Sequence, residues 1–176
     1  MRCLTLLLVL RLASAAPSQA PSDFTITGLY AEVISHSLLS SYSFDLSTSP
    51  KTIATSCLAT PQTESNGQLV NVSRTPCADD ARYTWAWTII TSTSSTSSSS
   101  DSSNPNTLDA ADDKSSSTTN TTCNIEYWFE GPHYSLYAAH HVPADQIVWT
   151  NQQSPTGTVQ AYAGPANFTV PVEIVY

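Results

Sequence analysis

The sequence predicts an all-β protein, a single-domain antiparallel β-barrel or β-sandwich that carries a long disordered Ser/Thr-rich inserted loop. Three observations support this prediction. Aromatic and β-branched residues are plentiful, prolines number 11, and strong helix formers are few. Short segments alternate apolar and polar residues with period two between turn residues. Of 176 residues, 50 are Ser or Thr, and 20 of these fall in the single stretch 91–122.

Some eight short strands are expected, in a regular succession along the chain. Four of them precede the insert. Their apolar residues are Phe24, Ile26 and 29–33 in the first, Tyr42, Phe44 and Leu46 in the second, the run 52–58 in the third, and Tyr83, Trp85, Trp87 and Ile89 in the fourth. The stretch 61–76 between them is polar and is predicted to be a loop. The later segments are 123–129, 134–142, 147–149, 158–163 and 168–176. Pro171 cannot donate to a ladder, so the last strand is expected at an edge.

The stretch 91–122 has Leu108 as its only large apolar residue. Such a segment cannot bury enough surface to offset the entropy lost on ordering, so disorder is predicted. It could instead link two domains, but the flanking segments of about 75 and 54 residues are each small for an independent core. An insert within one domain, 16–176, is therefore favoured.

Residues 1–15 have the features of a secretory signal peptide. Arg2 precedes an apolar run, and Ala13-Ser14-Ala15 is a small-x-small cleavage site. A membrane anchor would need about 20 apolar residues, which this run does not reach. We therefore expect a secreted, extracellular protein.

The charge of the chain excludes several classes of partner. Six Lys and Arg residues against fourteen Asp and Glu give a net charge of −8. A nucleic-acid partner is not expected, because there is no basic surface for phosphates. An anionic membrane would also repel the chain.

Removal of the leader leaves three cysteines, so in an oxidising compartment one pair and one leftover are expected. Cys57 and Cys77 bracket a polar loop, and a bridge between them would stabilise the fold by about 3 kcal/mol. It would also fix the pairing of strands 52–58 and 82–90. Cys123 would then be unpaired or intermolecular. Three N-glycosylation acceptor motifs begin at Asn71, Asn120 and Asn167.

No residue pattern indicates catalysis, a metal or a cofactor. His140 and His141 would point to opposite faces of a strand, and with His36 and His133 they form no metal-binding motif. Glu126 and Glu130 would lie about 13 Å apart on a strand, wider than glycosidases require. The large Ser content includes no G-x-S-x-G motif.

Aromatic residues are the best candidates for binding. Tyr83, Trp85 and Trp87 could form a stacking platform for carbohydrate, but their period of two with Ile89 favours a place in the core. Trp128 and Tyr137 are the better candidates for a binding surface, provided that they point outward.

The order of these elements resembles the fungal Alt a 1-like (AA1-like) family of small secreted β-barrel proteins. The resemblance rests on Phe24-Thr-Ile-Thr-Gly-Leu-Tyr, on Tyr42-Ser-Phe-Asp-Leu, and on Cys77-Ala-Asp-Asp-Ala-Arg-Tyr83 after a loop of about twenty residues from Cys57. The closing segment 168–176 also looks like the last strand of that family. The family's second disulfide has no counterpart, since only Cys123 is present in that half. The Ser/Thr-rich insert is not typical either.

The resemblance implies a non-enzymatic secreted protein of the effector or allergen type that acts in host interaction. Its expected partners are a host protein, a small ligand or a second copy of itself in a homodimer, although the mature N-terminus has no cysteine to link two copies. A secreted protein that binds carbohydrate or associates with the cell wall, with cell-wall glycan as its partner, is the alternative. A hydrolase is the weakest alternative.

Overall fold

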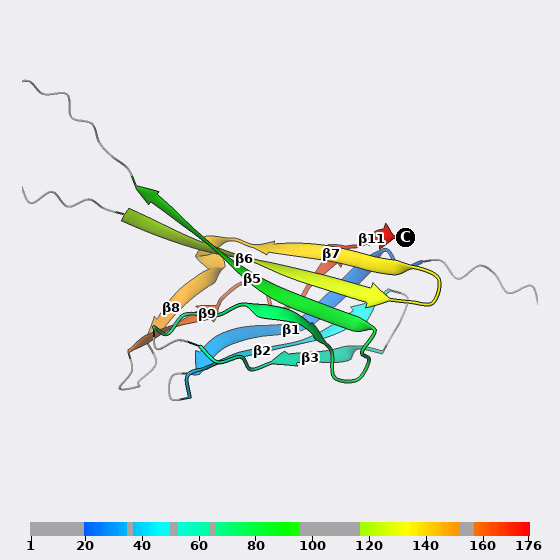
Figure 1. Ribbon diagram of the computed structural model, residues 1–176, viewed down its shortest axis with the longest axis horizontal. Helices are drawn as coiled ribbons and strands as arrows, with labels where there is room; N and C mark the ends of the chain where they lie inside the picture. The colour runs from blue at the N-terminus through cyan, green and yellow to red at the C-terminus, as the bar shows by residue number, and fades with distance from the viewer. Residues whose placement is uncertain (1–19, 35–36, 50–52, 64–65, 96–116, 152–156) are drawn as a thin grey trace, which may run out of the picture.

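The computed structural model describes residues 20–34, 37–49, 53–63, 66–95, 117–151 and 157–176 (Figure 1). The predicted leader and the middle of the Ser/Thr-rich tract lie outside these residues. About two thirds of the described residues lie in strands, and the helical element among them is one short 3₁₀ turn at Ala144–Gln146. No helix in the described ranges is long and apolar enough to cross a membrane.

Two antiparallel sheets make up the fold. The first sheet has the order β3-β2-β1-β9-β8, with β10 also paired to β1. Its strands are β1 (Asp23–Ile34), β2 (Leu39–Thr48), β3 (Thr55–Ala59), β8 (Ile147–Asn151), β9 (Thr158–Tyr162) and β10 (Phe168–Pro171). The second sheet has the order β11-β7-β6-β5-β4. Its strands are β4 (Val72–Pro76), β5 (Tyr83–Ser95), β6 (Ser117–Glu130), β7 (Ser135–Val142) and β11 (Glu173–Val175).

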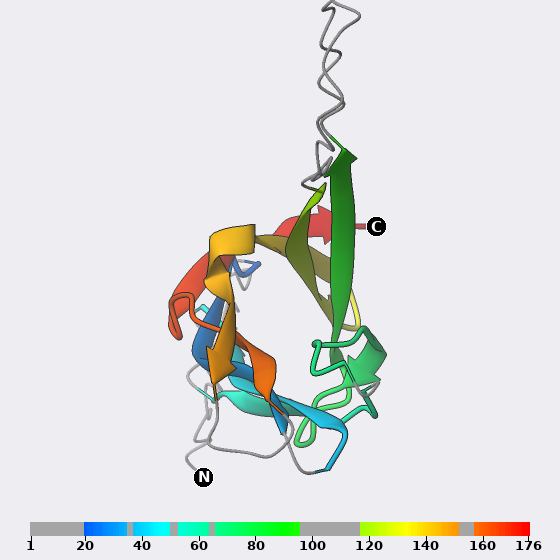
Figure 2. The ribbon, with the colours of Figure 1, turned by 90° about the vertical axis from the view of Figure 1, so that its left-hand side faces the viewer.

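The sheets face each other across one aromatic core, so the fold is a sandwich and not a closed barrel (Figure 2). Trp85 and Trp87 of β5 are fully buried, as the alternation along that segment predicts. From the first sheet, the Phe44 ring lies 5.1 Å from that of Trp85 and the Tyr42 ring 5.2 Å from that of Trp87, between ring centroids. Such tilted and edge-on contacts are favourable for aromatic rings. Tyr83, Trp85 and Trp87 therefore belong to the core.

A bulge in β1 explains why its buried residues change phase. Phe24 and Ile26 face the core, and then Leu29, Ala31 and Val33 do so. The register with β2 shifts between Thr27 and Tyr30, and Gly28 takes a φ of 67°. An extra residue in one strand moves every later side chain to the other face, and a glycine adopts that left-handed conformation most easily.

Both ends of the Ser/Thr-rich tract belong to strands, so the loop within the predicted insert 91–122 is shorter than expected. Strands β5 and β6 stay paired from Tyr83↔Phe129 as far as Ser95↔Ser117. They extend together past the rest of the sandwich (Figures 1 and 2). A ladder of backbone hydrogen bonds needs no apolar side chains, and threonine favours strands. The predicted disorder of 96–116 falls outside the described residues.

Two further predictions need correction. The stretch 61–76 was expected to be a loop, but it contains the edge strand β4, in which only Val72 is buried. The segment 168–176 was expected to be one strand, but it divides at Val172 between β10 in the first sheet and β11 in the second. At that point the Val172 N–H donates to the Ser22 carbonyl, which fixes the crossing.

Candidate binding site

The two aromatic residues proposed for binding lie side by side on the outer face of the second sheet. Trp128 of β6 and Tyr137 of β7 are directly paired in the ladder, and their ring centroids are 5.7 Å apart. Their neighbours Tyr127, Phe129, Leu136 and Ala138 point into the core. Strand alternation therefore presents both rings outward, as the binding prediction required.

Arg74 of β4 reaches across β5 to the same place. Its guanidinium carbon lies 4.6 Å from the centroid of the Trp128 ring, a cation–π contact. One nitrogen pairs with Glu130 Oε1 at 2.7 Å, and Nε donates to Thr84 Oγ1 at 2.8 Å. Both interactions leave Arg74 fixed at the side of the aromatic pair, with its charge balanced by Glu130.

Two carboxylates lie next to the tyrosine. The Tyr137 hydroxyl donates to Glu126 Oε1 at 2.9 Å, and Glu173 of β11 is paired directly with Tyr137 in the ladder. The pKa of the Tyr137 phenol is raised, first by partial burial and then by its bond to Glu126 and the negative charges of Glu126 and Glu173. Tyr137 therefore stays neutral and its hydroxyl remains a donor. This side of the aromatic pair is acidic.

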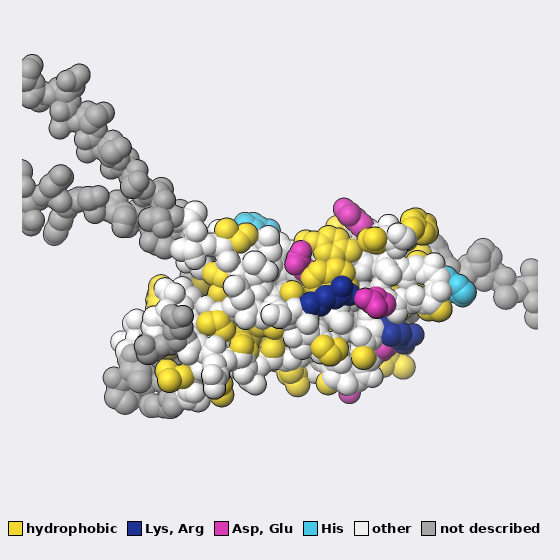
Figure 3. Space-filling view, viewed as in Figure 1, with side chains coloured by type: hydrophobic (Ala, Val, Ile, Leu, Met, Phe, Trp, Pro, Cys, Tyr) yellow, Lys and Arg dark blue, Asp and Glu magenta, His cyan; other side chains and the backbone are white. Residues whose placement is uncertain are grey.

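The aromatic pair borders a cleft with a volume of about 330 Å³. We call it the outer cleft; it is lined by Arg74, Trp128, Phe129, Glu130, Ser135, Leu136, Tyr137 and Val175. Figure 3 shows hydrophobic side chains gathered on this face of the molecule, with basic and acidic side chains at their border. Aromatic faces, one guanidinium and several carboxylate oxygens can hold a ligand by stacking and hydrogen bonds. None of them forms a nucleophile and base arrangement.

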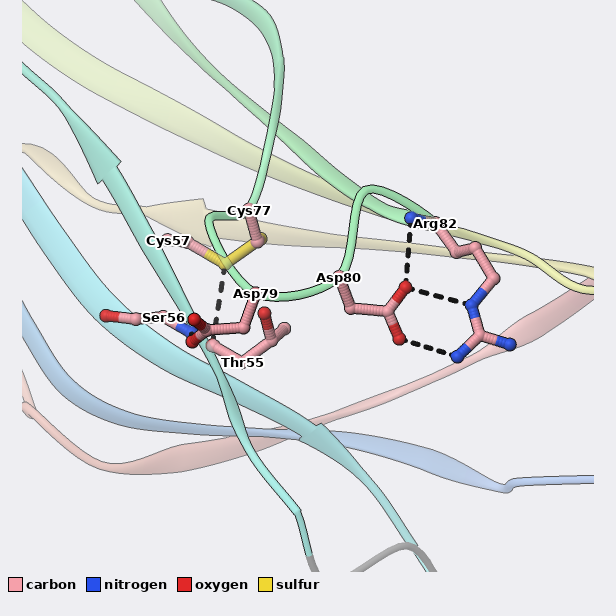
Figure 4. Close-up of a disulfide and its surroundings, with 7 residues drawn as sticks. All are labelled: Thr55, Ser56, Cys57, Cys77, Asp79, Asp80 and Arg82. Carbon is pink, nitrogen blue, oxygen red and sulfur yellow. Dashed lines mark hydrogen bonds and ion pairs between the residues drawn. A yellow bond between two sulfur atoms is a disulfide. The ribbon is translucent and has the colours of Figure 1, made fainter.

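The predicted disulfide is present and joins Cys57 to Cys77 (Figure 4). Its expected effect on strand pairing was wrong, because β3 pairs with β2 while Cys77 follows β4 in the other sheet. The bridge thus connects the two sheets. Around it the Ala78 N–H donates to the Ser56 carbonyl at 2.7 Å, and the Ser56 N–H donates to Asp79 Oδ2 at 3.3 Å. These bonds cover part of the β3 edge, so this region has a structural role.

Cys123 is free and fully buried in the core. Burial raises the pKa of its thiol to about 12, because the interior disfavours the thiolate. Within this chain the thiol is therefore unpaired. A bond to another chain would require the sandwich to open.

The histidines on β7 separate as strand geometry predicts. The His140 ring stacks on Phe168 with centroids 4.2 Å apart, whereas His141 is exposed and its Nδ1 lies 2.9 Å from Asn124 Oδ1. Burial and the neighbouring His141 lower the pKa of His140. Within the described residues, no group of three potential metal ligands comes together.

Two of the three glycosylation acceptors have described side chains, and both are exposed. Asn71 Oδ1 accepts the Ile89 N–H at 2.7 Å, and Asn167 Oδ1 accepts the Gly28 N–H at 2.9 Å. Both hydrogen bonds therefore use the side-chain oxygen. Neither uses the amide nitrogen, which is the atom that carries an N-linked glycan. Asn120 lies in β6 opposite Ser92 in the ladder. Its side chain is not among those that the structure describes.

Sequence reasoning found the aromatic pair but missed Arg74 and Glu173. Arg74 lies in the strand that was taken for a loop. Glu173 is the acidic residue of a closing segment that was expected to continue in one sheet. The alternation of 168–176 around Pro171 contains no signal for the change of sheet, so only the tertiary structure brings Glu173 to Tyr137.

Comparison with family models finds no match, and neither the curated proteins nor the solved structures include one with significant similarity. The resemblance to the Alt a 1-like family therefore remains a prediction from the residues quoted above.

Proposed function

We propose that this protein is a secreted, non-enzymatic binding protein of the effector or allergen type, which takes part in host interaction through the outer cleft. The observation that carries this proposal is the outward pair of Trp128 and Tyr137 beside that cleft. Large aromatic rings placed on a sheet face instead of in the core are characteristic of binding surfaces. The Cys57–Cys77 bridge is compatible with an oxidising extracellular compartment.

The experiment compares two tryptophan variants of the secreted protein. Trp128→Ala removes the aromatic pair, whereas Trp149→Ala removes a tryptophan that is 50% exposed on β8 of the other sheet. Binding to host cell-surface and extracellular proteins is measured with each. Loss with Trp128→Ala and retention with Trp149→Ala support the proposal. Equal binding by all three proteins contradicts it.

Carbohydrate binding is the second candidate, favoured by the hydrogen-bonding groups that surround the rings. Arg74, Glu126 and Glu130 offer donors and acceptors next to an aromatic face, as sugar hydroxyl groups require. Affinity electrophoresis in gels that contain cell-wall glucans or soluble chitin oligomers tests this candidate. Retardation that is lost in Trp128→Ala and kept in Trp149→Ala would favour it over a protein partner.

A further inference from the structure

The outer cleft lies against an open sheet edge. Among the described strands, β11 pairs with β7 on one side and with nothing on the other. Ile174 and Val175 of this strand are 41% and 49% exposed, and Val175 also lines the cleft. An extended peptide can add to such an edge by main-chain hydrogen bonds while its alternate side chains enter neighbouring pockets.

The register defines what an added strand would meet. Glu173, Tyr137, Trp128 and Thr84 form one row across the outer face, because each is paired with the next. A residue opposite Glu173 on an added strand would have its Cβ about 5 Å from that of Glu173. Its side chain would point over the same face, toward the Tyr137 ring and Glu126.

The carboxylates beside Tyr137 carry negative charge that no described basic residue balances. The described Lys and Arg residues are Arg74 and Arg82, and each is already paired with a carboxylate, Glu130 and Asp80 respectively. Glu126 and Glu173 have no basic partner among the described residues and both act on Tyr137. The whole chain carries a net charge of −8, which would draw a basic partner toward it.

We propose that the ligand of the outer cleft is an extended basic segment of a partner protein, which adds as a strand to β11 and places an arginine or lysine side chain between Glu173, Glu126 and the Tyr137 ring. The carboxylates supply ion pairs, and the aromatic face supplies a cation–π contact. Arg74 shows the same chemistry within the chain, because it lies over the other ring of the pair and bonds to Glu130. This inference rests on the proposed function and adds the chemical class of the partner.

The test uses a nonapeptide with arginine at alternate positions and threonine between them, and a second peptide in which citrulline replaces each arginine. Citrulline keeps the length and planar shape of the side chain but removes the charge and replaces one donor nitrogen with an acceptor oxygen. Calorimetric titration of the full chain should show binding of the arginine peptide, at least 10-fold weaker binding of the citrulline peptide, and weaker binding as NaCl rises. Equal affinity for both peptides, or no binding of the arginine peptide, overturns the inference.

Single variants locate the site. Glu173→Gln and Trp128→Ala should each weaken binding of the arginine peptide by about 2- to 5-fold, as expected for an exposed ion pair and a half-buried aromatic contact. Asp45→Asn, which changes an exposed carboxylate on β2 of the other sheet, is the matched control and should leave the affinity unchanged. An equal loss in Asp45→Asn would indicate general attraction to an acidic protein and overturns the proposal.

The outcomes also separate this inference from the proposed function. If a neutral chitin or glucan oligomer binds and Trp128→Ala abolishes that binding while the arginine peptide fails, the outer cleft is a binding site but its ligand is not a basic segment. If the arginine peptide binds with unchanged affinity to Trp128→Ala and Glu173→Gln, the peptide binds elsewhere and this inference fails, whereas the proposed function is decided separately by the comparison of Trp128→Ala with Trp149→Ala.

Discussion

The bridge between the two sheets gives the sharpest prediction for stability. The double variant Cys57→Ala/Cys77→Ala removes a covalent link between β3 and the residue that follows β4. Both cysteines are buried, with 0% and 3% exposure, and alanine is small enough to fill each position without a clash. The folded structure should therefore persist, and the main change should fall on the denatured chain.

The magnitude follows from the length of the loop that the bridge closes. The two cysteines are 20 residues apart in the sequence. The chain-entropy relation then gives a loss of about 3 kcal/mol in the free energy of unfolding at 25 °C. With an m value of about 2 kcal/mol/M in urea, the midpoint of unfolding should fall by about 1.5 M. The m value itself should rise, because an uncrosslinked chain exposes more surface when it unfolds.

Urea titration followed by tryptophan fluorescence measures both quantities. Cys123→Ala is the matched control, since it removes one buried sulfur atom and keeps the bridge. Wild-type protein with its bridge reduced should show the same midpoint as the double variant. The reasoning would be refuted if the double variant and Cys123→Ala unfolded at the same urea concentration with the same m value.

Three further predictions concern the core and the bulge. Trp85→Ala should cost about 3–5 kcal/mol because it empties a fully buried site, and thermal unfolding by circular dichroism checks this. Gly28→Ala should cost about 1–2 kcal/mol through its φ of 67° alone, since no atom lies within 4 Å of an added Cβ, and urea unfolding measures it. The Cys123 thiol should resist alkylation at pH 8 until the protein unfolds. Because its folded pKa of about 12 exceeds the ordinary thiol value of 9.0, its contribution to stability is complete below pH 9 and should be lost as pH rises toward 12, with a smaller loss in Cys123→Ala.

Local sequence patterns were sufficient to predict the strands that form the core. The alternation of Tyr83, Trp85 and Trp87 indicated a buried face, and all three are buried. The same rule placed Trp128 on the face opposite Tyr127 and Phe129, and the structure shows that this face points outward. The phase change in β1 is visible in the sequence, since Phe24 and Ile26 are even-numbered and Leu29, Ala31 and Val33 are odd-numbered. These features depend on side-chain period alone.

Other features depended on which strands become neighbours. Polar edge strand β4 buries one side chain, so its sequence carries almost no hydrophobic signal. The paired ends of the Ser/Thr-rich tract are stabilised by backbone hydrogen bonds, which amino-acid composition does not predict. The outer cleft combines residues of β4, β6, β7 and β11, from Arg74 to Val175.

The sequence by itself determined that the chain would form alternating strands around an aromatic core, that Cys57 and Cys77 would pair, and that Trp128 and Tyr137 would share an outward position if their strands met. The strand pattern and the outward position follow from the two-residue period of a strand. The choice of cysteine pair follows from the odd number of mature cysteines together with the polar stretch that Cys57 and Cys77 bracket. Only the tertiary structure decided that β6 lies beside β7, that the bridge joins two sheets, and that Arg74 and Glu173 flank the aromatic pair. Pairing between distant strands is set by how the whole core packs, and no local segment of the chain records it.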